Sequence, residues 1–139
     1  MGGQLFSRDQ LNAATNAIKK ARANGDNCVN IYGYSRGGYA ALKLVAMLAN
    51  TGISVNTLVT IDPVLVPGDN RDYLSVPSSV LSATNHYHQG HRQGPTDFPG
   101  TRLNDAPNVY NRFLPGGLRL PDRTVVRHEN MPYIVFHLR

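Results

Sequence analysis

The chain has little of several features that would place it in a specialised class of protein. It contains one cysteine, Cys28, among 139 residues, which excludes an internal disulfide and fits a reducing compartment. Cys28 stands where a strand is expected to begin, which predicts a small buried residue rather than a reactive thiol. No apolar run approaches the ~18 residues of a membrane span, and no charged start leads into a hydrophobic stretch. We therefore expect no transmembrane segment and no signal peptide; these patterns do not determine the location, which is taken as cytoplasmic only by default.

Acidic residues are in the minority, and the formal net charge is +5. A nucleic-acid binder usually clusters its basic residues in runs or along one helix face. Here the arginines from Arg92 onward come singly: Arg92, Arg102, Arg112, Arg119, Arg123, Arg127 and Arg139. Nucleic acid is therefore not the partner we expect, although a basic binding protein stays open as an alternative.

The first half of the chain alternates between helical and strand patterns. A capping box at Ser7 and Gln10 opens a helix that ends at Asn24-Gly25. A short strand, an Ala-rich helix and a second strand follow, at Cys28–Tyr32, Tyr39–Ala49 and Val55–Ile61. Strand, helix and strand with short connections predict a right-handed crossover and a parallel sheet.

The second half carries weaker signals. Val80–His88 reads as a third strand, Thr124–Arg127 as a short fourth strand, and Met131–Leu138 as a final helix. Residues 89–121 hold many Gly, Pro, Asn and Arg residues with little periodicity, which predicts a long irregular loop. We predict one α/β domain over residues 1–139, a three-layer sandwich around a short, mostly parallel sheet of about four strands.

The turn between the first strand and the Ala-rich helix carries Gly33-x-Ser35-x-Gly37. In a strand-turn-helix elbow of this spacing, the serine sits in a strained turn and its hydroxyl projects into a site. The strand end and helix start pass so close together that side chains would clash, which explains the flanking glycines. The pattern predicts Ser35 as a nucleophile, with the backbone amide of Arg36 as an oxyanion donor.

A serine needs a histidine to take its proton and a carboxylate to orient that histidine. Asp62 ends the strand after the elbow helix, and His128 follows the last expected strand, so these two are the predicted acid and base. Asp97 is the alternative acid, while Asp69, Asp72 and Asp105 are less constrained loop residues. The other candidate bases are His137 and the three histidines of an H-x-H-x-x-H pattern, His86, His88 and His91. That pattern also raises a metal site, but no Cys or acidic residue accompanies it at ligand spacing, and we expect none.

Two segments together carry a family resemblance: residues 31–38, IYGYSRGG, and residues 58–64, LVTIDPV. They resemble the α/β-hydrolase superfamily, and most of all lipase- and esterase-like bacterial members with an acid after the strand that follows the elbow. The resemblance implies Ser35 as nucleophile, Asp62 as acid and His128 as base, with no cofactor or metal. The sheet of that family has several strands before the elbow strand, and we find none here. We therefore expect the elbow strand at a sheet edge, and the chain to be a carboxyl-terminal portion of such a domain, a degenerate homologue, or half of an assembly that pairs at that edge.

Three functions follow from these patterns. The first is a serine acyl hydrolase acting on a carboxylic ester, with a small molecule or a lipid as substrate. The second is a catalytically incomplete remnant or interaction module that keeps the fold. The third is the basic binding protein. An open edge at the elbow strand also predicts pairing there with a second copy of the chain or with a missing amino-terminal partner.

Overall fold

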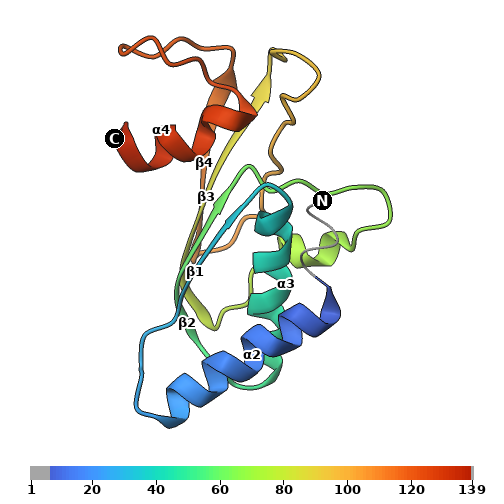
Figure 1. Cartoon of the computed structure of the whole chain (residues 1–139), viewed down its shortest axis with the longest axis vertical. Coiled ribbons are helices and arrows are strands. Elements are labelled where there is room, and N and C mark those ends of the chain that lie inside the picture. The colour runs from blue at the N-terminus through green and yellow to red at the C-terminus, as the bar shows by residue number, and fades with distance from the viewer. Residues whose placement is uncertain (1–6, 139) are drawn as a thin grey trace.

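A computed structural model describes residues 7–138 of the chain. The expectation of no signal peptide concerns the first residues, and residues 1–6 lie outside this range. The elements in chain order are α2 (Arg8–Ala23), β1 (Asn30–Tyr34), α3 (Arg36–Asn50), β2 (Val55–Ile61), η1 (Arg71–Leu74), β3 (Val80–Gly90), β4 (Val109–Gly116), η2 (His128–Asn130) and α4 (Met131–His137). The predicted α/β fold is confirmed (Figure 1). None of the helices in the described range is long and apolar enough to cross a membrane.

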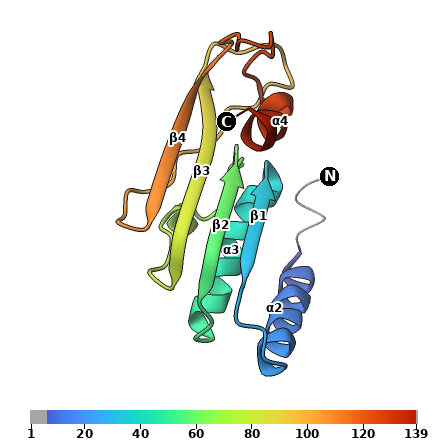
Figure 2. The ribbon, with the colours of Figure 1, turned by 90° about the vertical axis from the view of Figure 1, so that its left-hand side faces the viewer.

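The sheet has four strands in the order β1-β2-β3-β4, and every neighbouring pair is parallel (Figure 2). The elbow strand β1 lies at one edge, as predicted. Its ladder begins at Asn30, opposite Thr57, two residues later than the sequence indicated. Cys28 therefore precedes the sheet and is exposed, so the prediction of a buried cysteine is wrong.

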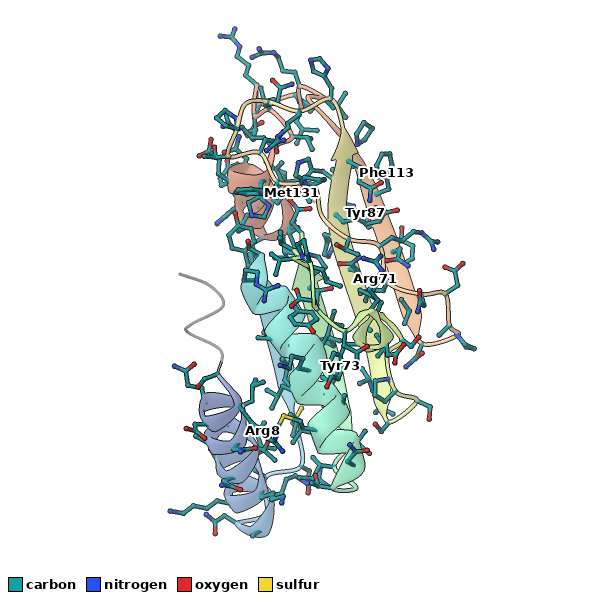
Figure 3. All side chains as sticks on the ribbon, turned by 90° about the vertical axis from the view of Figure 1, so that its right-hand side faces the viewer. Arg8, Arg71, Tyr73, Tyr87, Phe113 and Met131 are labelled. Atoms are coloured by element: carbon teal, nitrogen blue, oxygen red, sulfur yellow. The ribbon has the colours of Figure 1, made fainter. Side chains whose placement is uncertain are left out.

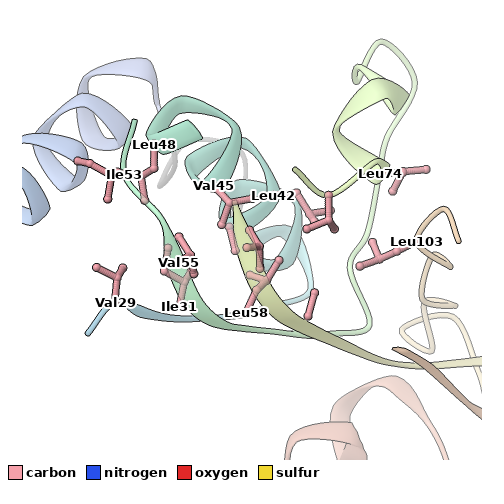
Figure 4. Close-up of a cluster of buried hydrophobic side chains, with 14 residues drawn as sticks. Val29, Ile31, Leu42, Val45, Leu48, Ile53, Val55, Leu58, Leu74 and Leu103 are labelled. Atoms are coloured by element: carbon pink, nitrogen blue, oxygen red, sulfur yellow. The ribbon is translucent and has the colours of Figure 1, made fainter. Parts of the chain in front are cut away.

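The main core lies between α3 and the sheet (Figure 4). Leu42, Val45 and Leu48 of α3 pack with Val55 and Leu58 of β2, and each of these five side chains is at most 1% exposed. Fully burying a side chain of this size stabilises the fold by roughly 1.5–3 kcal/mol. The Ala-rich composition of α3 thus serves its close packing on the sheet.

The opposite face of the sheet carries a smaller core around α4. Met131 and Ile134 of α4 pack with Ile61 of β2 and Leu114 of β4, and Figure 3 places Met131 near the end of the sheet that carries the elbow. Helix α4 is only seven residues long; it contacts β2 and β3, and its Phe136 packs against Tyr32 of β1 with 6.5 Å between ring centroids. A complete third layer, as the predicted sandwich would have, is therefore not seen in residues 7–138.

Strand β4 lies inside residues 89–121, where the sequence predicted an irregular loop throughout. It pairs with β3 over eight positions, from Ala83 opposite Val109 to Gly90 opposite Gly116. As an edge strand it shows no clean apolar alternation, and it tolerates Pro115 because one side of its backbone needs no ladder partner. The predicted strand at Thr124–Arg127 is also wrong, since Val125 forms only an isolated bridge with Arg119.

A row of polar side chains, two buried and one half-buried, crosses the sheet on the side of α3. Thr60, Asn85 and Asn111 occupy matched positions on β2, β3 and β4. Thr60 Oγ1 donates to Asn85 Oδ1 at 2.7 Å, and Asn85 Nδ2 donates to Asn111 Oδ1 at 3.0 Å. Asn85 Nδ2 also donates to the Thr101 carbonyl, and Asn111 Nδ2 to that of Leu103. This polar ladder ties the segment between β3 and β4 to the sheet.

Candidate active site

Ser35 occupies the turn between β1 and α3, at the carboxyl end of the sheet. Its backbone has φ 59° and ψ −127°, a conformation that costs a non-glycine residue of order 1–3 kcal/mol. Its amide donates to the Ile61 carbonyl at 3.0 Å, and its carbonyl accepts from Val64 at 3.1 Å. The strained turn is therefore held from the end of the neighbouring strand.

Glycine at the flanks of the elbow is required by close packing. A Cβ added at Gly33 would lie 2.8 Å from the Cβ of Ala41 and would also clash with the carbonyl of Gly37. At Gly38 it would lie 2.9 Å from Pro63. The close approach of strand and helix predicted from the sequence is confirmed at Gly33, and Pro63 accounts for the additional glycine.

The structure brings together the three predicted catalytic side chains. His128 Nε2 lies 3.0 Å from Ser35 Oγ, although the two residues are 93 positions apart. His128 Nδ1 lies 3.1 Å from Asp62 Oδ2. Asp62 is fully buried directly after β2, with φ 44°, and His128 opens η2. With the proton on Nδ1, His128 donates to Asp62 and presents a lone pair to the serine hydroxyl.

Two aromatic rings contact the His128 imidazole. Tyr34 stacks on it with 5.0 Å between ring centroids, and the Tyr34 hydroxyl donates to the His128 carbonyl at 2.9 Å. Burial, followed by the charges of Asp62 and Glu129, raises the pKa of Tyr34 to about 12. Phe98 meets the imidazole edge-on at 5.7 Å and is itself half exposed. These contacts restrict the imidazole to an orientation that faces the serine.

Asp97, the alternative acid, belongs to the same cluster in another role. Its Oδ1 accepts from the His128 backbone N–H at 2.7 Å and lies 2.6 Å from His88 Nε2. The other ring nitrogen of His88, Nδ1, lies 2.6 Å from Asp62 Oδ2. Asp97 therefore holds the backbone of His128, and His88 lies between the two carboxylates.

Sequence reasoning missed the role of His88, which it weighed only as a base or a metal ligand. One available signal was its position near the carboxyl end of β3. Parallel neighbours end at the same edge of a sheet, so a side chain there comes close to Asp62 at the end of β2.

The remaining acidic candidates have partners elsewhere. Asp69 pairs with the guanidinium of Arg36, and Asp105 pairs with Arg102 at 2.7 Å. Burial opposes ionisation of Asp69, but the hydrogen bond and charge of Arg36 outweigh it and lower its pKa. Asp72 lies in η1.

The remaining histidines also lie outside the cluster. His86 faces Arg112 at 3.4 Å, and burial, with the charge of Arg112, lowers the pKa of His86 to about 4. His137 stacks on Tyr133, and His91 is exposed. Within residues 7–138 no three His, Cys, Asp or Glu side chains are placed to hold a metal ion.

Arg36, the predicted oxyanion donor, is the first residue of α3. Its amide has no carbonyl partner within the helix, because the first amides of a helix are unpaired there. The guanidinium donates to the Val64 carbonyl at 3.0 Å and pairs with Asp69. This pair fixes the start of α3 to the segment after β2 and leaves the amide end of the helix beside Ser35.

A hollow of about 580 Å³ lies next to the cluster. Its lining includes Val64, whose amide donates to the Ser35 carbonyl, and Phe98, which contacts His128. Leu65, Pro99 and Gly100 also line it. Arg71, Gln89 and Thr101 line it as well, so the hollow beside the cluster has both polar and apolar walls.

Comparison of the chain with protein-family models, with curated proteins and with solved structures finds no match.

Proposed function

We propose that this protein is a serine acyl hydrolase of the α/β-hydrolase kind, acting on a carboxylic ester. One observation carries the proposal: Ser35, His128 and Asp62 form a continuous chain of contacts at a strained elbow. Chance would rarely place a serine, a histidine and a buried carboxylate in this order and at these distances. The order along the chain, serine, acid and histidine, is also that of the superfamily.

The proposed reaction starts with attack by Ser35 Oγ on the ester carbonyl carbon. His128 Nε2 takes the hydroxyl proton, and Asp62 stabilises the resulting imidazolium. The carbonyl oxygen becomes an oxyanion, which accepts from the Arg36 amide at the positive end of α3. As the C–O bond to the alcohol breaks, His128 returns the proton to the leaving alcohol, and an acyl-serine remains.

Water then completes the cycle. His128 removes a proton from a water molecule, whose oxygen attacks the acyl carbon. The proton passes to Ser35 Oγ as the acid leaves. Arg36 supplies the one oxyanion donor that we assign among the described residues. Because a missing donor costs on the order of a hundred- to a thousandfold in rate, we expect slow turnover.

The hollow beside the cluster is the place where we expect the ester to bind. Val64, Leu65 and Phe98 offer hydrocarbon contact, and Phe98 reaches both the hollow and His128. Arg71 and Gln89 line the same hollow, so it suits an ester that has both an apolar and a polar part.

The test is covalent labelling with a serine-directed fluorophosphonate probe. We expect the wild-type protein to be labelled and Ser35→Ala not to be labelled, because the probe reports an activated serine. Ser82→Ala is the matched control, since Ser82 is an exposed serine of β3 away from the cluster. Well-folded wild-type protein that stays unlabelled would overturn the proposal and favour the catalytically incomplete module.

We also propose that a further strand pairs with the open edge of β1. Unpaired backbone groups at an edge can bind another strand, and Tyr32 on β1 is 60% exposed. A second copy of the chain would supply one. Light scattering of the purified protein tests this: a dimer whose mass falls to that of a monomer on Tyr32→Lys substitution supports pairing there. A wild-type monomer at all concentrations rejects self-pairing.

A further inference from the structure

His88 has a carboxylate oxygen at hydrogen-bond distance from each of its ring nitrogens. Nδ1 lies 2.6 Å from Asp62 Oδ2, and Nε2 lies 2.6 Å from Asp97 Oδ1. The His88 backbone N–H also donates to Asp62 Oδ1 at 2.8 Å. The side chain of His88 is 3% exposed, and those of Asp62 and Asp97 are 0% and 1% exposed, so water does not mediate between them.

This geometry determines the number of protons on the ring. A neutral imidazole has one N–H and one lone pair, and the lone pair would face a carboxylate oxygen at 2.6 Å. Burial opposes a charge on His88, but the hydrogen bonds and charges of Asp62 and Asp97 outweigh it, and the pKa of His88 is raised. Burial likewise opposes ionisation of Asp97, but the bonds from Gln93, His128 and His88 lower its pKa. Both ring nitrogens therefore carry protons.

The other titratable and charged groups facing this ring agree with a cation there. His128 lies 6.3 Å away between ring centroids. His86, two residues earlier on β3, has a pKa lowered to about 4 and is neutral. Arg112 of β4 lies beyond His86 and contacts that ring rather than His88. The two carboxylates are thus the charges nearest to His88.

His88, Asp62, Asp97 and His128, the proposed base, form a closed ring of contacts. Asp62 Oδ2 contacts Nδ1 of the His128 ring, and Asp97 Oδ1 accepts from the backbone N–H of His128. His88 joins these two carboxylates. The charges of Asp62, Asp97 and His88 sum to one negative charge beside a neutral His128. A proton transferred from Ser35 to His128 would make the group neutral, which favours the transfer.

We infer that His88 is a positioning residue of this site: as an imidazolium it donates one N–H to Asp62 and one to Asp97, and so fixes the carboxylate that orients His128. Its protonation state is independent of the proposed hydrolase activity, whereas its effect on rate rests on that activity. The two parts are therefore tested separately.

The protonation state is tested by nitrogen NMR of protein labelled with ¹⁵N-histidine, in the Ser35→Ala background. We expect both ring nitrogens of His88 to show the shifts of protonated nitrogen at a pH above the ordinary imidazole pKa, where a free histidine is neutral. The signals are assigned by their loss in His88→Gln. A neutral ring at that pH overturns the inference, whether or not the protein is an enzyme.

The positioning role is tested by the pH dependence of fluorophosphonate labelling of Ser35. We expect His88→Gln to slow labelling by about tenfold to a hundredfold, as is typical when a group that orients a reacting side chain is removed. The acid limb of the pH–labelling profile should also move to higher pH in His88→Gln. The variant lacks a positive charge beside His128, so His128 binds a proton more readily. His91→Gln is the matched control, since His91 is exposed and outside the cluster.

The outcomes separate the two proposals. Unlabelled wild-type protein would overturn the hydrolase proposal and leave the NMR result standing. Labelling of His88→Gln at the wild-type rate and with the wild-type pH profile would overturn the positioning role. A slower rate with an unmoved acid limb would also overturn it, because a purely structural loss lowers rate without changing the charge beside His128.

Discussion

Gly100 offers a way to displace Asp62, the proposed catalytic acid, without altering any ionisable group. It is buried in the segment between β3 and β4, and its amide donates to the His88 carbonyl at 2.9 Å. A Cβ built on Gly100 would lie 2.8 Å from Asp62 Cα and 2.8 Å from the Cβ of Tyr87, and it would clash with Asp62 Oδ1. Gly100→Ala therefore pushes directly on the carboxylate that holds His128.

The size of the effect follows from these distances. Ordinary carbon contacts begin near 3.4 Å, so the atoms around the new Cβ must move away by about 0.6 Å. They are the Cα of Asp62 and the Cβ of Tyr87, which cannot move by rotating a side chain. Overpacking of this kind costs typically 1–3 kcal/mol of unfolding free energy. A misplacement of about 1 Å at a reacting group costs about a hundredfold in rate. We expect Gly100→Ala to slow labelling of Ser35 by about tenfold to a hundredfold.

The assay pairs the rate constant for fluorophosphonate labelling with the midpoint of urea unfolding. Gly25→Ala is the control: Gly25 has φ 93°, and a Cβ there would meet no atom within 4 Å. That substitution costs about 1–2 kcal/mol through backbone strain alone and leaves the site untouched. A Gly100→Ala protein that loses stability but is labelled at the Gly25→Ala rate would show that Asp62 is not held where we place it.

Two further predictions concern the charges of the cluster. Asp62→Asn should lower the labelling rate by about 10³- to 10⁴-fold, because an amide neither fixes the tautomer of His128 nor stabilises its imidazolium; a loss under tenfold would remove Asp62 from the triad. Unfolding free energy should depend on pH in two windows, measured by urea titration. The raised pKa of His88 stabilises the fold fully at pH values below the ordinary histidine pKa of 6.5. This contribution is lost as the pH rises through the pKa of His88 in the folded protein. The lowered pKa of Asp97 contributes stability above its ordinary 3.8 that is lost as pH falls. His88→Gln should abolish the first window, and its persistence would contradict that assignment.

Local patterns were sufficient to predict the elbow and its two partners. A strand followed by Gly33-x-Ser35-x-Gly37 and an Ala-rich helix fixes the turn through sterics that depend on neighbouring residues. Asp62 could be inferred because the carboxyl ends of parallel strands share one edge of the sheet. His128 was inferred from its late position in the order serine, acid and histidine, although the strand expected before it does not form. These inferences needed only the order of elements, which periodicity shows over short windows.

The features that escaped prediction depend on contacts between distant segments. The sequence of β4 has mixed polarity, and its place is determined by pairing with β3 rather than by its own pattern. The contact of His88 with Asp97 depends on how the intervening segment folds back over the strand end, which turn residues alone do not specify. Edge strands and ion clusters of this kind become visible only when the tertiary arrangement is known.

The polar ladder of Thr60, Asn85 and Asn111 has a consequence for fold specificity. A slip of one residue between neighbouring strands would turn each side chain to the opposite face and would separate the buried Thr60 and Asn85 from their hydrogen-bond partners. The same slip would carry His88 away from Asp62, since both depend on the alignment of β3 with β2. Hydrogen bonds that do not involve the serine thus select one alignment among several that apolar packing alone would tolerate. We expect that replacing Asn85 with an apolar residue lowers the free energy of unfolding only slightly. Its main effect would be that β3 pairs with its neighbours in more than one alignment.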